Sequence, residues 1–193
     1  MCLLLLTFLI PAVFTISNKN VVEANSNVNE EENNVKEYPQ YNYGQYTTIK
    51  LLHTATNTIE QIELDEYLYG VVSAEMPANF EMEALKSQAI VARTYTIYKI
   101  VNGEKKHGEA DICDDSNCCQ AWISKENRLA RWEEESREEN WNKIVAAVNE
   151  TKGIIIAYEG SPINAFFHSN SGGTTEAPVN VWGGSRVPVF AGS

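Results

Sequence analysis

Apolar and β-branched residues gather in two pairs of short segments, each pair separated by a few polar or small residues, and each pair predicts a β-hairpin. Residues 47–52 and 58–64 are rich in β-branched side chains and flank Ala-Thr-Asn at 55–57, a sequence suited to a tight turn. Residues 154–158 and 163–168 are also apolar and are separated by Glu-Gly-Ser. We therefore expect short antiparallel strands in both places.

Longer segments between these hairpins carry apolar residues at helical spacing. The first helix is predicted to begin at Asp65, a capping residue, and to end before Pro77. Its apolar positions are Leu68, Val71, Val72 and Met76. A second helix is predicted over 81–101, with Asn79 as its cap and Gly103 as its stop.

A third helix is predicted over 141–152, in which Ile144, Val145 and Val148 would face inward. Helices of this kind, combined with short hairpins, indicate the α+β fold class. We expect the helices to pack on short antiparallel strands and to leave a groove between them.

The two ends of the chain differ from this middle part. Residues 1–16 contain almost no polar side chain and predict a membrane anchor or signal segment; since no small-residue cleavage pattern follows, an anchor is favoured. Residues 17–45 are acidic and Asn-rich and predict a flexible linker. The folded domain is expected over 46–193, and its last part, 169–193, is loop-like, which predicts a C-terminally incomplete domain.

The charge of the chain limits its partners. There are 26 acidic and 15 basic residues, and the formal charge is −11. Proteins that bind nucleic acid normally use clustered lysines and arginines, so this balance argues against a nucleic-acid partner. With 44% hydrophobic residues over 193 positions, the chain can bury an ordinary core.

One acidic and two basic residues are candidates for chemistry. Glu75 lies seven residues after Leu68, on the apolar face of the first predicted helix, where lost hydration favours a protonated carboxyl group. Lys86 and Arg93 are seven apart on the second helix and share one face. The alternatives are ordinary ones: a solvated glutamate or one paired with either cation, and cations bridging acidic neighbours on their own helix.

A polar segment after the second helix contains a cluster of metal-ligand side chains. His107, Cys113, Cys118 and Cys119 lie within thirteen residues and can complete a tetrahedral Zn²⁺ site. A disulfide is the usual state of exported cysteines, but three local cysteines leave one unpaired, and Cys2 lies in the anchor. Zinc, a disulfide with one free thiol, and unbound thiols are the alternatives, and only zinc uses all four ligands.

Three segments carry short motifs. They are Ser-Ala-Glu-Met-Pro at 73–77, Glu-Ala-Leu-Lys-Ser-Gln-Ala at 83–89 with Ala-Arg-Thr-Tyr at 92–95, and Phe-His-Ser-Asn-Ser-Gly-Gly-Thr-Thr at 167–175. In that order and spacing, the segments resemble the stage II sporulation protein D family and its relative, the amidase enhancer. The resemblance covers about residues 50–184. The combination is specific, although each motif alone is weak.

The resemblance implies a lytic transglycosylase and makes residues 46–193 its catalytic domain. Such enzymes cleave the β-1,4 bond between N-acetylmuramic acid (MurNAc) and N-acetylglucosamine (GlcNAc) of denuded peptidoglycan, and the muramic 6-hydroxyl closes on C1 to give a 1,6-anhydro end. An acid must protonate the departing oxygen and a base must take the hydroxyl proton, and one carboxyl group can do both in turn. The matching residue is Glu75, and the predicted groove would bind glycan.

The resemblance to the family also implies residues that bind the substrate. The implied substrate-binding residues are Lys86, Gln88, Arg93, Tyr95, His168, Ser169, Ser171 and Thr175. Trp182, which precedes two glycines, is an aromatic side chain suited to stacking on a sugar. Some family members resemble this chain in having a His/Cys zinc cluster after the second helix, with histidine at the position of Cys118, which implies a structural Zn²⁺.

The resemblance also implies a setting. The implied process is engulfment of the forespore during sporulation, with the stage II sporulation proteins M and P as partners, the latter an amidase. We expect a single-pass protein of the mother-cell membrane whose catalytic domain lies outside the cytoplasm and faces the intermembrane space. The alternative is a non-catalytic, glycan-binding activator of a cell-wall amidase.

Overall fold

A computed structural model describes residues 41–103, 106–168 and 172–182 of the chain. The predicted anchor at 1–16 and most of the predicted linker at 17–45 therefore lie outside the described residues. In the part that is described, no helix has both the length and the apolar character needed to cross a bilayer.

The first predicted hairpin is confirmed. Strand β1 (Thr48–His53) pairs antiparallel with β2 (Thr58–Glu63), and Asn57 adopts a φ of 54° in the turn between them. This left-handed conformation suits asparagine better than most residues. A third strand that the sequence analysis did not predict, β3 (Ile112–Cys113), pairs parallel with β1 and completes a sheet in the order β2-β1-β3.

Three helices pack against one another, and two of them also pack against this sheet. They are α2 (Leu64–Glu75) and α3 (Met82–Val101), which contact the sheet, and α5 (Arg137–Glu150). Their shared core contains fully buried aliphatic side chains from every layer, among them Leu51, Leu68, Val72, Leu85, Ile112, Ile144 and Val148. The inward residues predicted for the third helix agree, except that Val145 is only half-buried.

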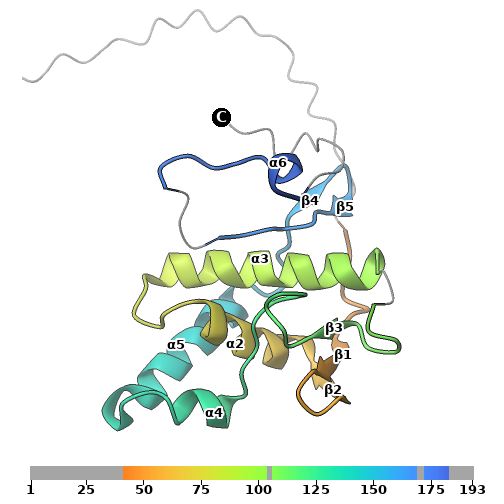
Figure 1. The fold of residues 1–193 in the computed structure, drawn as a ribbon. Coiled ribbons are helices and arrows are strands. Elements are labelled where there is room, and N and C mark those ends of the chain that lie inside the picture. The colour runs from red at the N-terminus through yellow and green to blue at the C-terminus, as the bar shows by residue number, and fades with distance from the viewer. Residues whose placement is uncertain (1–40, 104–105, 169–171, 183–193) are drawn as a thin grey trace, which may run out of the picture. The chain divides into compact units, whose positions relative to one another are not determined.

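The remaining elements are short. They are α4 (Lys125–Leu129), the 3-10 turn η1 (Glu134–Ser136), β4 (Ala157–Tyr158), β5 (Ser161–Pro162) and α6 (Pro178–Trp182). Strands β4 and β5 form a short hairpin where the second one was predicted. The second strand was misplaced: β5 begins at the end of the predicted turn, and residues 163–168, which were expected to form it, are not in a strand. Figure 1 shows α3 across the middle of the domain, with α2, α4, α5 and the three-stranded sheet on one side and β4, β5 and α6 on the other.

The predicted helix starts were wrong by one to four residues. The cap of α2 is Glu63, not Asp65, and the cap of α3 is Glu81, not Asn79; neither makes a side-chain capping bond. Helix α5 begins at Arg137 instead of 141, because its first turn is polar and gives no apolar signal. The α+β class is confirmed, but the expected glycan-binding groove is not shown in the described residues.

Candidate functional site

Glu75 is the last residue of α2, and its half-buried carboxylate is held by the backbone of a distant loop. The N–H of Ala121 donates a hydrogen bond of 2.7 Å to Oε1 of Glu75. Oε2 makes no hydrogen bond to any described residue. The carboxyl group therefore has a fixed orientation and one oxygen available for a ligand.

The residue before Ala121 anchors this loop in the core. Gln120 is 1% exposed, and its Nε2 lies 3.0 Å from both the Tyr67 hydroxyl and Thr96 Oγ1, on α2 and α3 respectively. Buried polar groups need such partners, so Gln120 fixes the loop against both helices. The sequence carried no signal for this contact, because it depends on tertiary packing alone.

Lys86 lies partly exposed on α3 and bridges two acidic side chains. Its Nζ is 2.8 Å from Glu83 on the same helix and 2.7 Å from Glu150 at the end of α5. Hydrogen bonds to Glu150 and then to Glu83 raise the pKa of Lys86. Lys86 therefore pairs with acidic side chains, which was the alternative to a role in sugar binding. Its side chain also remains partly exposed at the surface.

Arg93 lies on the same face of α3 but is fully buried. Its guanidinium donates to the carbonyl oxygens of Val148 (3.0 Å), Thr151 (2.9 Å) and Ile154 (3.3 Å), which cap the C-terminal end of α5. Asp65 lies 4.0 Å away. In this conformation Arg93 has no surface to offer a sugar, so we correct the expected basic stripe: Arg93 holds α3 to α5.

The other expected substrate-binding residues are spread over the domain. Gln88 and Tyr95 are 9% and 7% exposed on α3, and Tyr95 lies under Lys99, whose Nζ is 5.3 Å from its ring centroid. His168 and Thr175 are exposed. Ser169 and Ser171 lie outside the described residues, and for Trp182 only the backbone, in α6, is described. The structure does not gather this set around Glu75.

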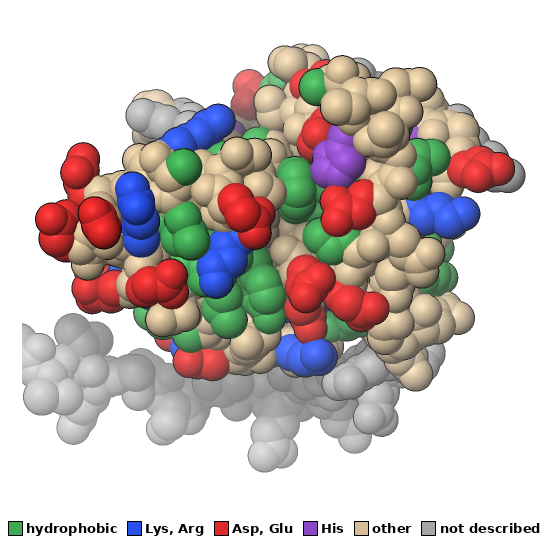
Figure 2. Space-filling model, turned by 90° about the horizontal axis from the view of Figure 1, so that it is seen from below, with side chains coloured by type: hydrophobic (Ala, Val, Ile, Leu, Met, Phe, Trp, Pro, Cys, Tyr) green, Lys and Arg blue, Asp and Glu red, His purple; other side chains and the backbone are tan. Residues whose placement is uncertain are grey.

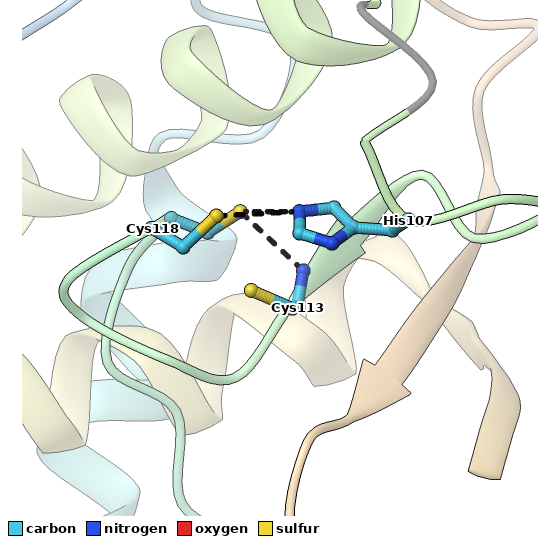
Figure 3. Close-up of side chains that lie close together, drawn as sticks. His107, Cys113 and Cys118 are labelled. Carbon is cyan, nitrogen blue, oxygen red and sulfur yellow. Dashed lines mark hydrogen bonds between the residues drawn. The ribbon is translucent and has the colours of Figure 1, made fainter. Parts of the chain in front are cut away.

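The His/Cys cluster, in contrast, is assembled in space. The ligand atoms of His107, Cys113, Cys118 and Cys119 all lie within 4.8 Å of one another. His107 Nε2 is 3.6 Å from Cys118 Sγ and 3.4 Å from Cys119 Sγ. Figure 3 shows the side chains of His107, Cys113 and Cys118 pointing toward one another. Cys113, Cys118 and Cys119 are free thiols, and the four groups could hold a metal ion.

Neighbouring acidic residues tie the cluster loop to the sheet. Asp114 Oδ1 accepts from the Thr54 N–H at 3.0 Å and from its hydroxyl at 2.7 Å, and Asp111 accepts from the Lys50 N–H at 2.8 Å. Burial raises the pKa of the Cys113 thiol and raises that of Cys119 to about 12. Both sulfurs therefore stay protonated as long as no metal ion is bound.

A family comparison gives the same class of protein as the sequence motifs, the stage II sporulation proteins. The family model described as SpoIID, Stage II sporulation protein, matches residues 52–158. This match covers strand β2 of the first hairpin, the three long helices and the whole His/Cys cluster. The chain belongs to this family of sporulation proteins, which are associated with the bacterial cell wall.

Individual relatives place the chain near stage II sporulation protein D. It is 35% identical over 188 residues to that protein of Bacillus subtilis, covering 94% of this chain and 54% of the relative. For Bacillus amyloliquefaciens, the identity is 37% over 136 residues, covering 70% of this chain and 39% of the relative. The amidase enhancer of B. subtilis is 37% identical over 121 residues, covering 63% of this chain and 14% of the relative. The chain thus spans about half the length of these sporulation relatives or less.

Proposed function

We propose that the chain is a lytic transglycosylase of peptidoglycan, with Glu75 as its acid and base. One observation carries this proposal: the Glu75 carboxyl group is fixed at the end of α2 by the 2.7 Å hydrogen bond from the Ala121 N–H. A group held in one orientation can transfer a proton without first being ordered, which lowers the barrier. The match to the sporulation family supports the same assignment.

The arrangement suits both proton transfers. In the protonated carboxyl group, Oε1 is the carbonyl oxygen that accepts from Ala121, and Oε2 carries the proton. Oε2–H donates this proton to the glycosidic oxygen as the bond between MurNAc C1 and GlcNAc O4 breaks. The resulting carboxylate then takes the proton of the muramic 6-hydroxyl as its oxygen bonds to C1, which restores the acid and gives the 1,6-anhydro end.

We propose that the His/Cys cluster binds a structural Zn²⁺ ion. A tetrahedral zinc site, with bonds of about 2.3 Å to sulfur and about 2.0 Å to nitrogen, separates its sulfur and nitrogen ligands by about 3.5 Å. The distances of 3.4 and 3.6 Å from His107 to the vicinal cysteines fit that geometry. When bound, zinc would stabilise the folded loop; no step of glycan cleavage needs it.

We also propose a cellular location and partners for the protein. Residues 1–16 would anchor the protein in the mother-cell membrane, with the domain outside the cytoplasm. The stage II sporulation proteins M and P would act beside it during engulfment, the latter by removing stem peptides to supply denuded glycan. The sporulation relatives support the role in sporulation.

The deciding experiment is incubation of the purified chain with denuded glycan, followed by mass analysis for 1,6-anhydro-muramic ends. We expect such products from the wild-type chain and their loss, by at least about a hundredfold, from Glu75→Gln. Glu139→Gln, which removes an exposed carboxylate from α5, is the matched control and should retain full activity. Unchanged product formation by folded Glu75→Gln would remove the catalytic assignment.

The second candidate is a non-catalytic, glycan-binding activator of an amidase, and the amidase enhancer relative favours it. It predicts that the chain forms no anhydro products by itself. It also predicts that adding the chain to an amidase and intact peptidoglycan increases peptide release equally for wild type and Glu75→Gln. The two candidates therefore differ in both assays.

A further inference from the structure

Gln120 carries a buried amide group that the proposed mechanism does not use. Figure 2 views the domain from the side of α4 and β2, where hydrophobic side chains gather with acidic ones around them. Gln120 contributes almost nothing to this or any other surface, because it is 1% exposed. It cannot touch a substrate directly, so any part that it takes in the reaction must act through a neighbouring residue.

The amide group of Gln120 is bonded to both helices between which it lies. Nε2 donates to the Tyr67 hydroxyl of α2 and to Thr96 Oγ1 of α3, each at 3.0 Å. The Thr96 hydroxyl itself donates to the carbonyl oxygen of Ala92 at 2.8 Å, which leaves its lone pairs for Gln120. Two bonds to different helices fix both the position and the rotation of the side chain, which an apolar residue of the same length would not do.

The backbone of Gln120 adjoins the donor that holds Glu75. The Ala121 N–H belongs to the peptide unit that begins at the Cα atom of Gln120, and the atoms of a peptide unit lie in one plane. Once residue 120 is fixed, only its ψ angle can still change the direction of this N–H. The nitrogen of Ala121 lies 2.7 Å from Glu75 Oε1.

The residues on both sides of this peptide unit are held as well. On one side, the Cys119 N–H donates to the carbonyl oxygen of Asp115 at 2.8 Å. On the other side, Trp122 packs against Gly70, where a Cβ atom would lie 2.3 Å from its Nε1. The ψ angle of Gln120 therefore has little freedom, and the direction of the N–H follows from the position of residue 120.

We propose that Gln120 is a positioning residue for the acid. Its amide group holds the peptide unit shared with Ala121, and this unit keeps the Glu75 carboxyl group in the orientation that both proton transfers need. A displacement of about 1 Å can cost about a hundredfold in rate. Since Gln120 does not contact the substrate, its loss should lower kcat and leave KM unchanged. The assignment rests on the proposed function, in which Glu75 is the acid and base.

Gln120→Met, which keeps the length of the side chain and removes the amide group, tests the proposal through initial rates on denuded glycan. We expect kcat to fall by about ten- to a hundredfold while KM stays within about twofold of wild type. Thr96→Val removes one acceptor and should lower kcat by about threefold to tenfold. The double variant should be no slower than Gln120→Met alone, because both substitutions remove the same hydrogen bond.

Thr94→Val is the matched control on the same helix. Thr94 and Thr96 are both 0% exposed, and each donates to the carbonyl oxygen four residues earlier, Thr94 at 2.6 Å. Thr94 accepts from the Ile156 N–H at 2.9 Å instead of from Gln120. Thr94→Val should lower the melting temperature about as much as Thr96→Val and leave kcat unchanged. Equal losses of kcat in the two variants would indicate general loosening of α3 and contradict the proposal.

Hydrogen exchange of the Ala121 amide, followed by NMR, measures the positioning without catalysis. We expect exchange at least about tenfold faster in Gln120→Met than in wild type, and unchanged in Thr94→Val. A wild-type kcat or a wild-type exchange rate in folded Gln120→Met would overturn the inference. If Gln120→Met does not fold, unchanged Ala121 exchange in both Thr96→Val and Tyr67→Phe would overturn it.

The exchange measurement also separates this inference from the proposed function. A wild-type chain that forms no anhydro products would refute the catalytic assignment of Glu75. Faster Ala121 exchange in Gln120→Met would then still show that Gln120 holds this N–H against Glu75. Unchanged exchange together with normal product formation by the wild-type chain would refute only the role of Gln120.

Discussion

Glu75 accepts a hydrogen bond of 2.7 Å from the backbone of Ala121, so the C-terminal end of α2 is tied to the loop that follows the His/Cys cluster. A backbone donor cannot be removed by shortening a side chain. Proline at position 121 removes it while leaving the carboxyl group in place.

Ala121→Pro should lower the formation of anhydro-muramic products by about ten- to a hundredfold, because a mobile carboxyl group spends less time in the productive geometry. The measurement is the initial rate on denuded glycan, with circular dichroism as a check on folding. Ala121→Ser keeps the N–H and should retain nearly full activity. A folded proline variant with the wild-type rate would show that the hydrogen bond has no part in positioning Glu75.

Arg93→Met should lower the free energy of unfolding by about 3–5 kcal/mol, because the buried carbonyl groups of Val148 and Thr151 and the partly buried one of Ile154 lose a charged donor. Urea denaturation followed by circular dichroism measures this loss. Lys152→Met removes the exposed cation that also pairs with Asp65, at 2.7 Å, and should change the stability little. Similar losses in both variants would contradict the structural role of Arg93.

Gly70→Ala should destabilise the domain by about 1–3 kcal/mol through overpacking. A Cβ at this position would lie 2.3 Å from Trp122 Nε1 and 2.8 Å from the Ile123 carbonyl oxygen. The indole must move, so tryptophan fluorescence should change as well. Combining Gly70→Ala with Trp122→Leu should recover part of the loss, and strictly additive effects would argue against the contact.

Removal of the proposed zinc ion should lower the melting temperature of the chain. A ligand that binds only the folded state stabilises it by about 2.7 kcal/mol at a free concentration one hundred times its Kd. We expect one zinc per chain by mass spectrometry under native conditions. The melting temperature of wild type should be higher with zinc than with chelator. This difference should disappear in Cys118→Ser and remain in Ser116→Ala, which lies on the same loop. A chain that melts identically with zinc and with chelator would contradict a structural metal.

Much of the fold was predictable because its elements have local signals. The turn at 55–57 and the apolar positions of α2 and α3 predicted the first hairpin and two helices within a few residues of their observed bounds. Strand β3 was not predictable, since two residues carry no period and the strand exists only through pairing with β1. The polar first turn of α5 was missed for a similar reason.

The site was predictable only in part. Four metal-ligand side chains close together in the sequence were also found close together in space. Arg93 was misassigned because helical spacing shows that two cations share a face, but not that this face is covered by α5. The contact of Glu75 with Ala121 joins residues 46 positions apart, and no local pattern records it.

Cys113 differs from the other three members of the His/Cys cluster, because it is part of strand β3 and only 1% exposed, while the others lie in turns and bends. The sheet therefore presents one sulfur in a fixed position as soon as β3 pairs with β1. We expect the hairpin core to form first and the cation to be captured last, when His107 and the vicinal cysteines close over it. Maturation of the protein would then end with a loading step that depends on the metal supply of its compartment.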